Sequence, residues 1–212
     1  MHYTSVLFDL DGTLLDTLGD LTAAMNRTLT RHGLPERTRQ QMRAALGNGA
    51  RQLMELSVPA GTDGALFETL LAEYNADYAA HCRIETAPYP GVDALLQQLH
   101  AQGRKLAIVS NKPDEAVRAL RTEFFADTAV GEKQGIRRKP APDTLLTAMV
   151  QLGAERTSTV YVGDSEVDIA TARAAGLPCI SVLWGFRDRD VLEQAGAQQF
   201  AADTGELARL LD

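Results

Sequence analysis

Two aspartates at the end of a short apolar run are the residues of this chain whose types and spacing most directly suggest chemistry. The segment reads SVLFDLDGTLLDT over residues 5–17, with Asp9 and Asp11 separated by a single leucine. Neighbouring carboxylates repel each other, so their pairing predicts a bound cation, and carboxylate oxygens are the ligands that Mg²⁺ prefers. Asp11-Gly12 is also a common turn pair, so the competing interpretation is a simple turn after a strand.

Three further groups that could take part in chemistry follow predicted strands elsewhere in the chain. Ser110-Asn111 comes at the end of the run KLAIVS, Asp164 ends STVYVGD, and Lys139 lies in the proline-rich stretch KPAPD. Because the carboxyl ends of parallel strands meet at one edge of a sheet, we expect these groups to share a crevice with Asp9. Carboxylates, an ammonium and a hydroxyl in one crevice indicate a site for a divalent cation together with an anion such as a phosphate dianion.

These residue types would support phosphoryl transfer through a covalent intermediate. With a divalent cation and Lys139 neutralising the phosphate, Asp9 would attack phosphorus in line and form an aspartyl-phosphate. Asp11 would protonate the leaving oxygen and later take a proton from the hydrolytic water. Further hydrogen-bond donors to the phosphoryl oxygens are expected beside these residues, from the backbone around Gly12, from Ser110 and from the backbone of Asn111.

The elements that must hold these residues alternate between strand and helix from about residue 88 onward. Apolar runs typical of buried strands are separated by helical patterns that end at glycines, as at Gly103 and Gly153, and Pro113 and Pro142 are each expected to open a helix. The predicted strands lie at residues 105–110, 129–131, 158–164 and 178–184 and near Phe200. Such alternation predicts a parallel sheet with right-handed crossovers, which the strand of residues 6–10 would join.

Between the first strand and this alternating part, the chain shows helical periodicity and no strand signal. Gly33, Gly47-Asn48-Gly49 and Pro59-Ala60-Gly61 separate the expected helices. The simplest architecture is an α/β core of residues 1–15 and 84–212 with a helical insertion of residues 16–83. An insertion at this point would sit over the carboxyl end of the first strand, where open α/β sheets bind ligands, and would act as a lid.

Composition and charge limit the partners that we expect. The 212 residues carry a formal net charge of −7, which disfavours binding to nucleic acid or to an anionic membrane. No apolar stretch approaches the roughly 18 residues of a membrane-spanning helix. Cys82 and Cys179 have neither metal-site spacing nor a disulfide pattern, and the N-terminal residues lack the pattern of a signal peptide. We therefore expect a cytoplasmic monomer or homodimer that acts on a small phosphorylated metabolite.

The four chemical stretches together resemble the motifs of haloacid dehalogenase-superfamily phosphatases, in order and across the whole chain. The matching segments are DLDGT, the Ser-Asn of VSNK, KPAPD and GDSEVD. The resemblance implies a Rossmann-like core with a helical cap inserted after the first motif, with Asp9 as nucleophile and Asp11 as acid and base. It also implies Mg²⁺ bound by Asp9, the main-chain carbonyl of Asp11 and Asp164, with Asp168 as a supporting group near the metal or the lysine. The positions that match phosphate-binding residues are Ser110 and Lys139.

A closer resemblance links the chain to phosphoglycolate phosphatases and their near relatives. The similar segments are GNGARQLMEL in the helical part, PYPGV, VSNKP, KPAPD and LWGF. The four core motifs carry the resemblance to the superfamily, and these further segments, with GNGARQLMEL from the helical part among them, carry the resemblance to the subgroup. It implies a Mg²⁺-dependent phosphomonoesterase that acts on 2-phosphoglycolate.

Several charged residues also have ordinary structural interpretations. Lys139 alone would be a solvated surface lysine, but Pro140 and Pro142 stiffen its loop, which favours a functional role. Asp168 is interpreted as a hydrogen-bond acceptor that supports the site without binding the metal directly. The cap contains a cluster of arginines that is typical of solvated helix surface: Arg27, Arg31, Arg37, Arg39, Arg43 and Arg51. Of these, Arg51 follows the glycine-rich turn and is the candidate contact for the anionic tail of a substrate.

Other functions could use the same set of residues. The nearest alternative is a pyrophosphatase or a broad-specificity phosphatase of sugars and small metabolites. A β-phosphoglucomutase-like phosphotransferase would use the same two aspartates, but that subgroup usually has Glu-Asp where this chain has Gly163-Asp164. Dehalogenases and phosphonoacetaldehyde hydrolases on this scaffold typically replace the second aspartate, which is present here as Asp11. A phospho-accepting signalling domain would also cluster carboxylates, Ser and Lys, but Asp11 is placed to hydrolyse the adduct.

Overall fold

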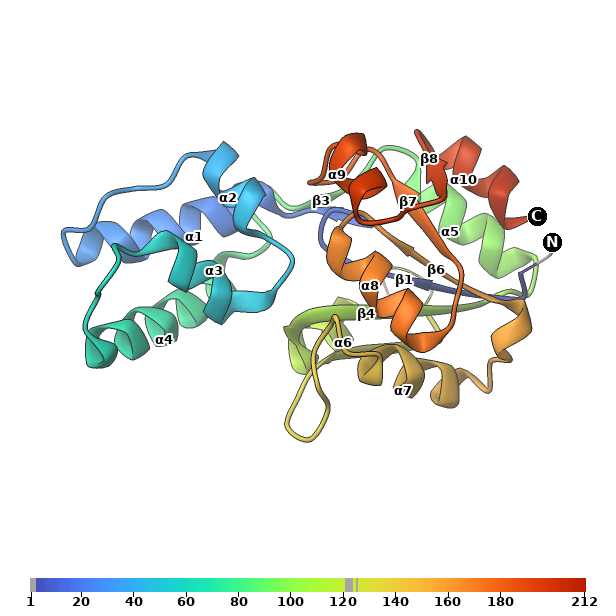
Figure 1. Cartoon of the computed structure of the whole chain (residues 1–212), viewed down its shortest axis with the longest axis horizontal. Coiled ribbons are helices and arrows are strands. Elements are labelled where there is room, and N and C mark those ends of the chain that lie inside the picture. Colours follow the sequence, from blue (N-terminus) through green and yellow to red (C-terminus); the bar gives the residue numbers. More distant parts are fainter. Residues whose placement is uncertain (1–2, 121–123, 125) are drawn as a thin grey trace. The chain divides into compact units, whose positions relative to one another are not determined.

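The computed structural model describes residues 3–120, 124 and 126–212 of the chain. The chain divides into two compact units, one of Met1–Leu15 with Pro88–Asp212 and one of Asp16–Ala87. Figure 1 labels the helices and strands of both units. Two short strands, β2 (Leu15–Asp16) and β3 (Ala87–Pro88), pair where the chain passes from one unit to the other.

The helical unit ends at Ala87, whereas the sequence predicted an insertion that ends at residue 83. Residues 84–87 therefore belong to the helical unit. The backbone N–H groups of Ile84, Glu85 and Thr86 all donate to the carboxylate of Asp20, over 2.9–3.1 Å. Asp20 lies in the first turn of α1 (Leu18–Arg31), so its carboxylate fastens the returning chain to that helix. The pattern of apolar residues carries no trace of this contact, since the donors are backbone atoms.

The larger unit is built around a parallel sheet of six strands in the order β5-β4-β1-β6-β7-β8, which confirms the predicted α/β architecture. The strands are β1 (Ser5–Phe8), β4 (Lys105–Pro113), β5 (Thr128–Glu132), β6 (Thr159–Gly163), β7 (Cys179–Val182) and β8 (Gln199–Ala201). On β1, Phe8 pairs with Ile108 of β4 on one side and with Val162 of β6 on the other. Strands β4 and β5 lie on one side of β1, and β6, β7 and β8 lie on the other. Where the strand order reverses direction in this way, a crevice forms at the carboxyl ends of the strands.

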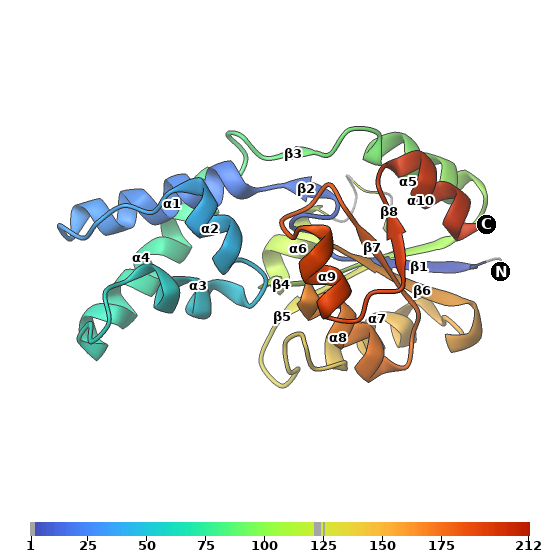
Figure 2. The same cartoon turned by 45° about the horizontal axis from the view of Figure 1, so that its top comes forward.

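Alternating side chains of the sheet enter two separate cores. Val6 and Phe8 pack with α5 (Val92–Ala101) and α10 (Thr204–Leu211), whereas Leu7 packs with α7 (Asp143–Leu152) and α8 (Glu166–Ala175). Figures 1 and 2 show these two pairs of helices on opposite faces of the sheet. The unit also contains α6 (Asp114–Leu120), α9 (Arg189–Gln194) and the short 3₁₀ helix η2 (Arg156–Ser158). Burial on both faces explains why the central strands are almost continuously apolar.

Strand β4 differs from its sequence prediction at its carboxyl end. It continues through Asn111 and Lys112 to Pro113, so Pro113 closes the strand and α6 begins at Asp114. After a local irregularity, Pro113 pairs with Glu132 of β5. The proline has no N–H to give to the ladder, but it is tolerated because it stands at the end of the strand.

The smaller unit is helical, as the periodicity predicted. It contains α1, α2 (Arg39–Ala45), α3 (Gly49–Ser57) and α4 (Gly64–His81). The helices end close to the glycine and proline stretches that the sequence marks as breaks. A buried carboxylate joins the two long helices, since Asp77 of α4 accepts hydrogen bonds from Arg27 (2.6 Å) and Arg31 (2.9 Å) of α1. These arginines therefore have structural partners inside the unit.

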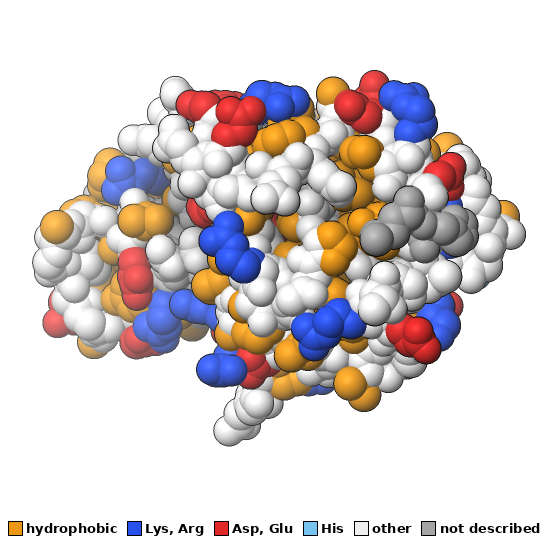
Figure 3. Space-filling view, turned by 45° about the vertical axis from the view of Figure 1, so that its right-hand side comes forward, with side chains coloured by type: hydrophobic (Ala, Val, Ile, Leu, Met, Phe, Trp, Pro, Cys, Tyr) orange, Lys and Arg blue, Asp and Glu red, His pale blue; other side chains and the backbone are white. Residues whose placement is uncertain are grey.

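One face of the molecule has a mixed surface. On the face drawn in Figure 3, acidic and basic side chains are interspersed with polar and apolar ones. Among the described residues, no helix combines the length and the apolar character needed to cross a bilayer. Cys82 and Cys179 are both free thiols.

Candidate functional site

Asp9 and Asp164 stand at the carboxyl ends of two neighbouring central strands. Asp9 directly follows β1, and its backbone N–H donates to the carbonyl of Val162 on β6 (2.9 Å). This hydrogen bond to β6 fixes the backbone of Asp9 although the residue lies just beyond the end of β1. Asp164 directly follows β6. The pairing of Phe8 with Val162 places the two carboxylates beside each other.

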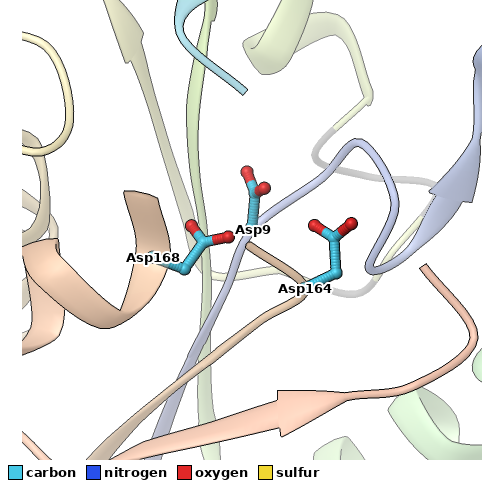
Figure 4. A group of neighbouring side chains, drawn as sticks. All are labelled: Asp9, Asp164 and Asp168. Atoms are coloured by element: carbon cyan, nitrogen blue, oxygen red, sulfur yellow. The ribbon is translucent and has the colours of Figure 1, made fainter. Parts of the chain in front are cut away.

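Asp168 brings a third carboxylate to the same point from the first turn of α8. Ser165 caps this helix, and its hydroxyl (2.6 Å) and backbone N–H (3.1 Å) both donate to Asp168 Oδ2. Carboxylate oxygens of Asp9, Asp164 and Asp168 lie within 4.8 Å of one another. Figure 4 shows them converging from the end of β1, the end of β6 and α8. The structure thus brings together three of the aspartates that the sequence singles out.

The ammonium of Lys139 lies between two of these carboxylates. Lys139 Nζ is 2.8 Å from Asp9 Oδ1 and 2.8 Å from Asp168 Oδ1, and it donates to the hydroxyl of Tyr161 (3.0 Å). Tyr161 in turn donates to Asp168 Oδ1 (3.0 Å). All three N–H donors of the ammonium therefore have acceptors. Sequence reasoning missed Tyr161, although a hydroxyl-bearing side chain inside the apolar run TVYVG was a usable signal.

The side chain of Asn111 holds the loop that carries Lys139. Asn111 Oδ1 accepts the backbone N–H of Lys139 (2.8 Å), and Asn111 Nδ2 donates to the carbonyl of the same residue (3.1 Å). This pair of hydrogen bonds to the main chain fixes where the lysine side chain starts. The amide of Asn111 is therefore committed to Lys139, and only its backbone can serve the phosphate role that the sequence predicted.

The electrostatics of this cluster favour an added cation. Three carboxylates and one ammonium leave two negative charges uncompensated when all the groups are ionised. Burial and then the charge of Asp168 raise the pKa of Asp9 well above its ordinary value, and the same two causes raise the pKa of Asp164 to about 7. Burial opposes the charge of Lys139, but Asp168 and Asp9 outweigh it and raise the pKa of its ammonium. The donor set therefore fits a hard divalent ion with oxygen ligands.

These pKa directions predict how stability depends on pH and metal. In EDTA, we expect the melting temperature to fall as pH rises from about 5 to about 8, because Asp9 and Asp164 hold protons in the folded state that they release on unfolding. The stabilisation from these raised pKa values is present at low pH and is lost as pH rises through about 7. Mg²⁺ competes with these protons, so it should raise the melting temperature most at the alkaline end.

Differential scanning fluorimetry with and without MgCl₂ checks this expectation. An Asp164→Asn variant is the matched control, because it removes one of the two titrating carboxylates at nearly constant volume. The pH dependence of its Mg²⁺ effect should be much weaker. If Mg²⁺ raises the melting temperature of the parent protein equally at about pH 5 and at about pH 8, the carboxylate cluster is not the metal site.

Two glycines leave room for the carboxylate of Asp164. Gly12 has φ of +83°, and a Cβ there would lie 2.2 Å from Asp164 Oδ2. A Cβ on Gly185 would lie 2.3 Å from the Cβ of Asp164, and the backbone N–H of Phe186 donates to Asp164 Oδ2 (2.7 Å). The N–H of Gly12 itself donates to the carbonyl of Leu15 (2.8 Å). The N–H of Gly12 is therefore engaged within its own turn, and the residue leaves space for Asp164, while the phosphate role expected of the backbone around Gly12 stays a prediction. Sequence reasoning missed Gly185 within LWGF.

A Gly12→Ala variant should lose metal affinity. The new methyl group displaces Asp164, so we expect Mg²⁺ binding and activity to fall about 10- to 100-fold. Gly135→Ala is the matched control, because Gly135 has the same φ of +83° but no atom within 4 Å of the place that its new methyl group would take. Mg²⁺ titrations of activity and of melting temperature measure both variants. Equal effects of the two substitutions would assign the loss to backbone strain alone.

Asp11 and Ser110 lie near the same edge of the sheet and have polar neighbours of their own. Asp11 Oδ1 is 2.7 Å from the ammonium of Lys112. Ser110 Oγ accepts the backbone N–H of Lys112 (3.2 Å), which leaves its hydroxyl hydrogen to donate to another group. Sequence reasoning gave Lys112 no role, although it directly follows the Ser-Asn pair in VSNK.

Arg51 belongs to the helical unit and has partners there. Its guanidinium makes two hydrogen bonds to the carboxylate of Glu68 (2.8 and 2.9 Å) and lies over the ring of Phe67. Both charged side chains are largely exposed. A guanidinium that is already paired in this way is a weaker anion receptor than an isolated one, and its contact with substrate stays a prediction.

Comparison with known proteins supplies an independent line of evidence. A sequence profile described as haloacid dehalogenase-like hydrolase matches residues 6–182. A phosphoglycolate phosphatase of Xanthomonas campestris pv. campestris is 37% identical over 187 residues, which cover 86% of this chain and 84% of that protein. An N-acetylmuramic acid 6-phosphate phosphatase of Pseudomonas aeruginosa is 31% identical over 217 residues, which cover 100% of this chain and 96% of that protein.

A solved structure is similar over the whole chain. It is the crystal structure of a protein from Lactobacillus delbrueckii subsp. bulgaricus that was proposed to be a phosphoglycolate phosphatase. The two share 36% sequence identity with a TM-score of 0.94, and the match covers 100% of this chain and 99% of the other. The similarity therefore extends through both units as well as through the motifs.

Proposed function

This chain belongs to the haloacid dehalogenase-like hydrolase family and is a phosphatase of that family; on this premise we propose that it hydrolyses 2-phosphoglycolate through an aspartyl-phosphate formed on Asp9. One observation carries the chemical part of the proposal. Asp9 is buried at the end of the central strand, 2.8 Å from the ammonium of Lys139 and beside two further carboxylates. Such a group is a nucleophile only where its charge and that of a phosphate are neutralised together.

The residues that would hold Mg²⁺ are Asp9, Asp164 and the main-chain carbonyl of Asp11. Asp168 has both oxygens engaged by protein donors, which suits a supporting role toward Lys139 rather than direct metal binding. When bound, the cation would neutralise the cluster and polarise a phosphoryl oxygen. The uncompensated negative charge and the space that Gly12 leaves for Asp164 support this fit.

Lys139 and Ser110 would orient the phosphoryl group for attack by Asp9. The ammonium already has three acceptors, so a phosphoryl oxygen must replace one of them, and Asp9 Oδ1 is the acceptor that changes when Asp9 becomes esterified. Tyr161 and Asp168 keep the lysine in place during that exchange. The free hydroxyl hydrogen of Ser110 would donate to a second phosphoryl oxygen. Catalysis of this kind consists of positioning and charge neutralisation.

Asp11 would handle the proton. It would protonate the bridging oxygen as the alkoxide leaves and later take a proton from the water that hydrolyses the aspartyl-phosphate. Asp11 follows Asp9 by two residues, just beyond the end of β1, so both carboxylates belong to the same short segment at this edge of the sheet.

The similarity to a phosphoglycolate phosphatase at 37% identity supports this substrate over others. The similarity to an N-acetylmuramic acid 6-phosphate phosphatase at 31% identity supports the second candidate, a phosphatase of sugar phosphates and other small metabolites. A β-phosphoglucomutase-like activity is less well supported. A Cβ on Gly163 would lie 2.4 Å from the side chain of Asp168, so the Glu-Asp pair typical of that subgroup does not fit this arrangement.

An assay of phosphate release from a panel of esters tests the proposal. Purified protein with Mg²⁺ is given 2-phosphoglycolate, several sugar phosphates, N-acetylmuramic acid 6-phosphate and pyrophosphate. We expect the highest kcat/KM for 2-phosphoglycolate and none without a divalent cation. A flat response to 2-phosphoglycolate with a sharp maximum for another ester would overturn the substrate while keeping the chemistry. Unchanged rates in EDTA would overturn the chemistry.

A further inference from the structure

Lys112 is a second cation at the catalytic edge of the sheet, apart from the one that serves the nucleophile. Its ammonium lies 2.7 Å from Asp11 Oδ1, and both side chains are mostly buried, with exposed fractions of 12% and 20%. Lys139, in contrast, contacts Asp9 and Asp168. The two lysines therefore address different parts of the reaction, because Asp9 meets phosphorus and Asp11 meets the leaving oxygen.

Lys112 lies two residues after Ser110 on the last part of β4, where the pairing with β5 is irregular. The contacts place these residues: Asn111 binds the main chain of Lys139, and the backbone N–H of Lys112 donates to Ser110 Oγ (3.2 Å). The ammonium of Lys112 itself lies beside Asp11. The phosphate end and the leaving-group end of the site are thus lined by neighbouring residues of one strand.

We propose that Lys112 is a specificity-determining residue that binds an anionic substituent on the leaving group, one carbon away from the bridging oxygen. This inference rests on the proposed function, since it takes Asp11 as the group that contacts the bridging oxygen. An ammonium within hydrogen-bond distance of Asp11 then faces the atoms next to that oxygen. In 2-phosphoglycolate, the carboxylate is bonded to the carbon that carries the bridging oxygen, so it comes within reach of Lys112.

The chemistry of this position favours a carboxylate over a neutral group. An ammonium has three N–H donors, so Lys112 can share one with an anionic substituent while it stays paired with Asp11, whereas a methyl group in that place offers no acceptor. Hydrogen bonds to charged groups contribute enough to change kcat/KM by about 10- to 100-fold. Lys112 would therefore select for the carboxylate from within the α/β unit itself.

The test compares 2-phosphoglycolate with ethyl phosphate, which has a methyl group where the former has its carboxylate. The measured quantity is the ratio of kcat/KM for the two esters. In Lys112→Gln, we expect this ratio to fall about 10- to 100-fold, and in Lys112→Arg, which keeps the charge, to fall less. Lys105→Gln is the matched control, because Lys105 lies at the opposite end of the same strand, where its ammonium donates to the carbonyl of Gly153 (3.0 Å). Its ratio should not change.

The outcomes separate this inference from the proposed function. If Lys112→Gln slows both esters by the same factor, Lys112 acts only by orienting Asp11, and the inference is overturned. If the parent protein hydrolyses both esters without preferring the carboxylate, the inference fails while the phosphatase chemistry stands. If the parent protein hydrolyses neither ester but cleaves other phosphates, the substrate proposal fails, and the inference fails with it. Melting temperatures show that each variant is folded.

Discussion

An Asp9→Asn variant should lose phosphomonoesterase activity by on the order of 10⁴- to 10⁶-fold while the protein stays folded. The amide has nearly the shape of the carboxylate, but it is a far weaker nucleophile and cannot form the aspartyl-phosphate. The loss is expected to be this large because every later step depends on that ester. Asp168 is not placed to substitute, since its two oxygens are held by Tyr161 and Ser165.

The stability of the Asp9→Asn variant shows whether its loss of activity comes from unfolding. In the metal-free protein, burial and the neighbouring Asp168 raise the pKa of Asp9, so the ionised carboxylate is unfavourable at neutral pH. A neutral amide relieves that repulsion, and its oxygen can still accept a hydrogen bond from Lys139. We therefore expect Asp9→Asn in EDTA at neutral pH to melt at or above the temperature of the parent protein.

Initial rates with 2-phosphoglycolate and melting curves in EDTA measure the two halves of this prediction. The control is Asp93→Asn, which makes the same chemical change at an exposed position on α5 and should leave activity intact. Phosphate release at the parental rate by Asp9→Asn would remove the covalent mechanism. Loss of activity together with a large fall in melting temperature would leave the role of Asp9 structural.

The sheet and the main site residues could be predicted because strong local signals mark them. The segments that form β1 and the other buried strands are apolar runs bounded by turn or polar residues, and their alternation with helices predicts a parallel sheet. Parallel strands then bring the residues after β1 and β6 together, so the pairing of Asp9 with Asp164 follows from topology alone. The position of Lys139 needed the resemblance to a family as well, since it lies in a loop.

The contacts that sequence reasoning missed are of two physical kinds. Some use backbone atoms, such as the N–H of Phe186 on Asp164 and the bonds of Asn111 to the main chain of Lys139, and residue types do not reveal these. Others are steric: Gly12 is conspicuous in a motif, but that it leaves room for a side chain far along the sequence emerges only when β1 and β6 are paired.

An Asp11→Asn variant should show losses that depend on the leaving group. Without the proton that Asp11 supplies, esters with an alkoxide leaving group, including 2-phosphoglycolate, should react about 10²- to 10⁴-fold more slowly. p-Nitrophenyl phosphate has a leaving group that departs as a stable anion, so the first step should be far less affected. The hydrolysis of the aspartyl-phosphate still needs a base that takes a proton from the attacking water. Because an amide in place of the Asp11 carboxylate cannot act as that base, the aspartyl-phosphate on Asp9 should accumulate in the Asp11→Asn variant.

The measurement is a rapid-quench experiment that follows both p-nitrophenol and protein-bound phosphate. With p-nitrophenyl phosphate, we expect Asp11→Asn to release close to one equivalent of p-nitrophenol in a burst and then to stall with labelled protein. With 2-phosphoglycolate, neither a burst nor a label should appear on the same time scale. The double variant Asp9→Asn, Asp11→Asn is the control, because it lacks the acceptor and should give no burst.

This pattern distinguishes a proton-transfer role for Asp11 from a merely structural one. Asp11 pairs with Lys112 over 2.7 Å, so its replacement could instead disturb the loop that carries Asp9. A disturbed loop would slow both esters alike and leave no trapped phosphate. A long-lived label in Asp11→Asn beside a short-lived one in the parent protein would show that one carboxylate makes the difference between an enzyme that turns over and a domain that only accepts phosphate.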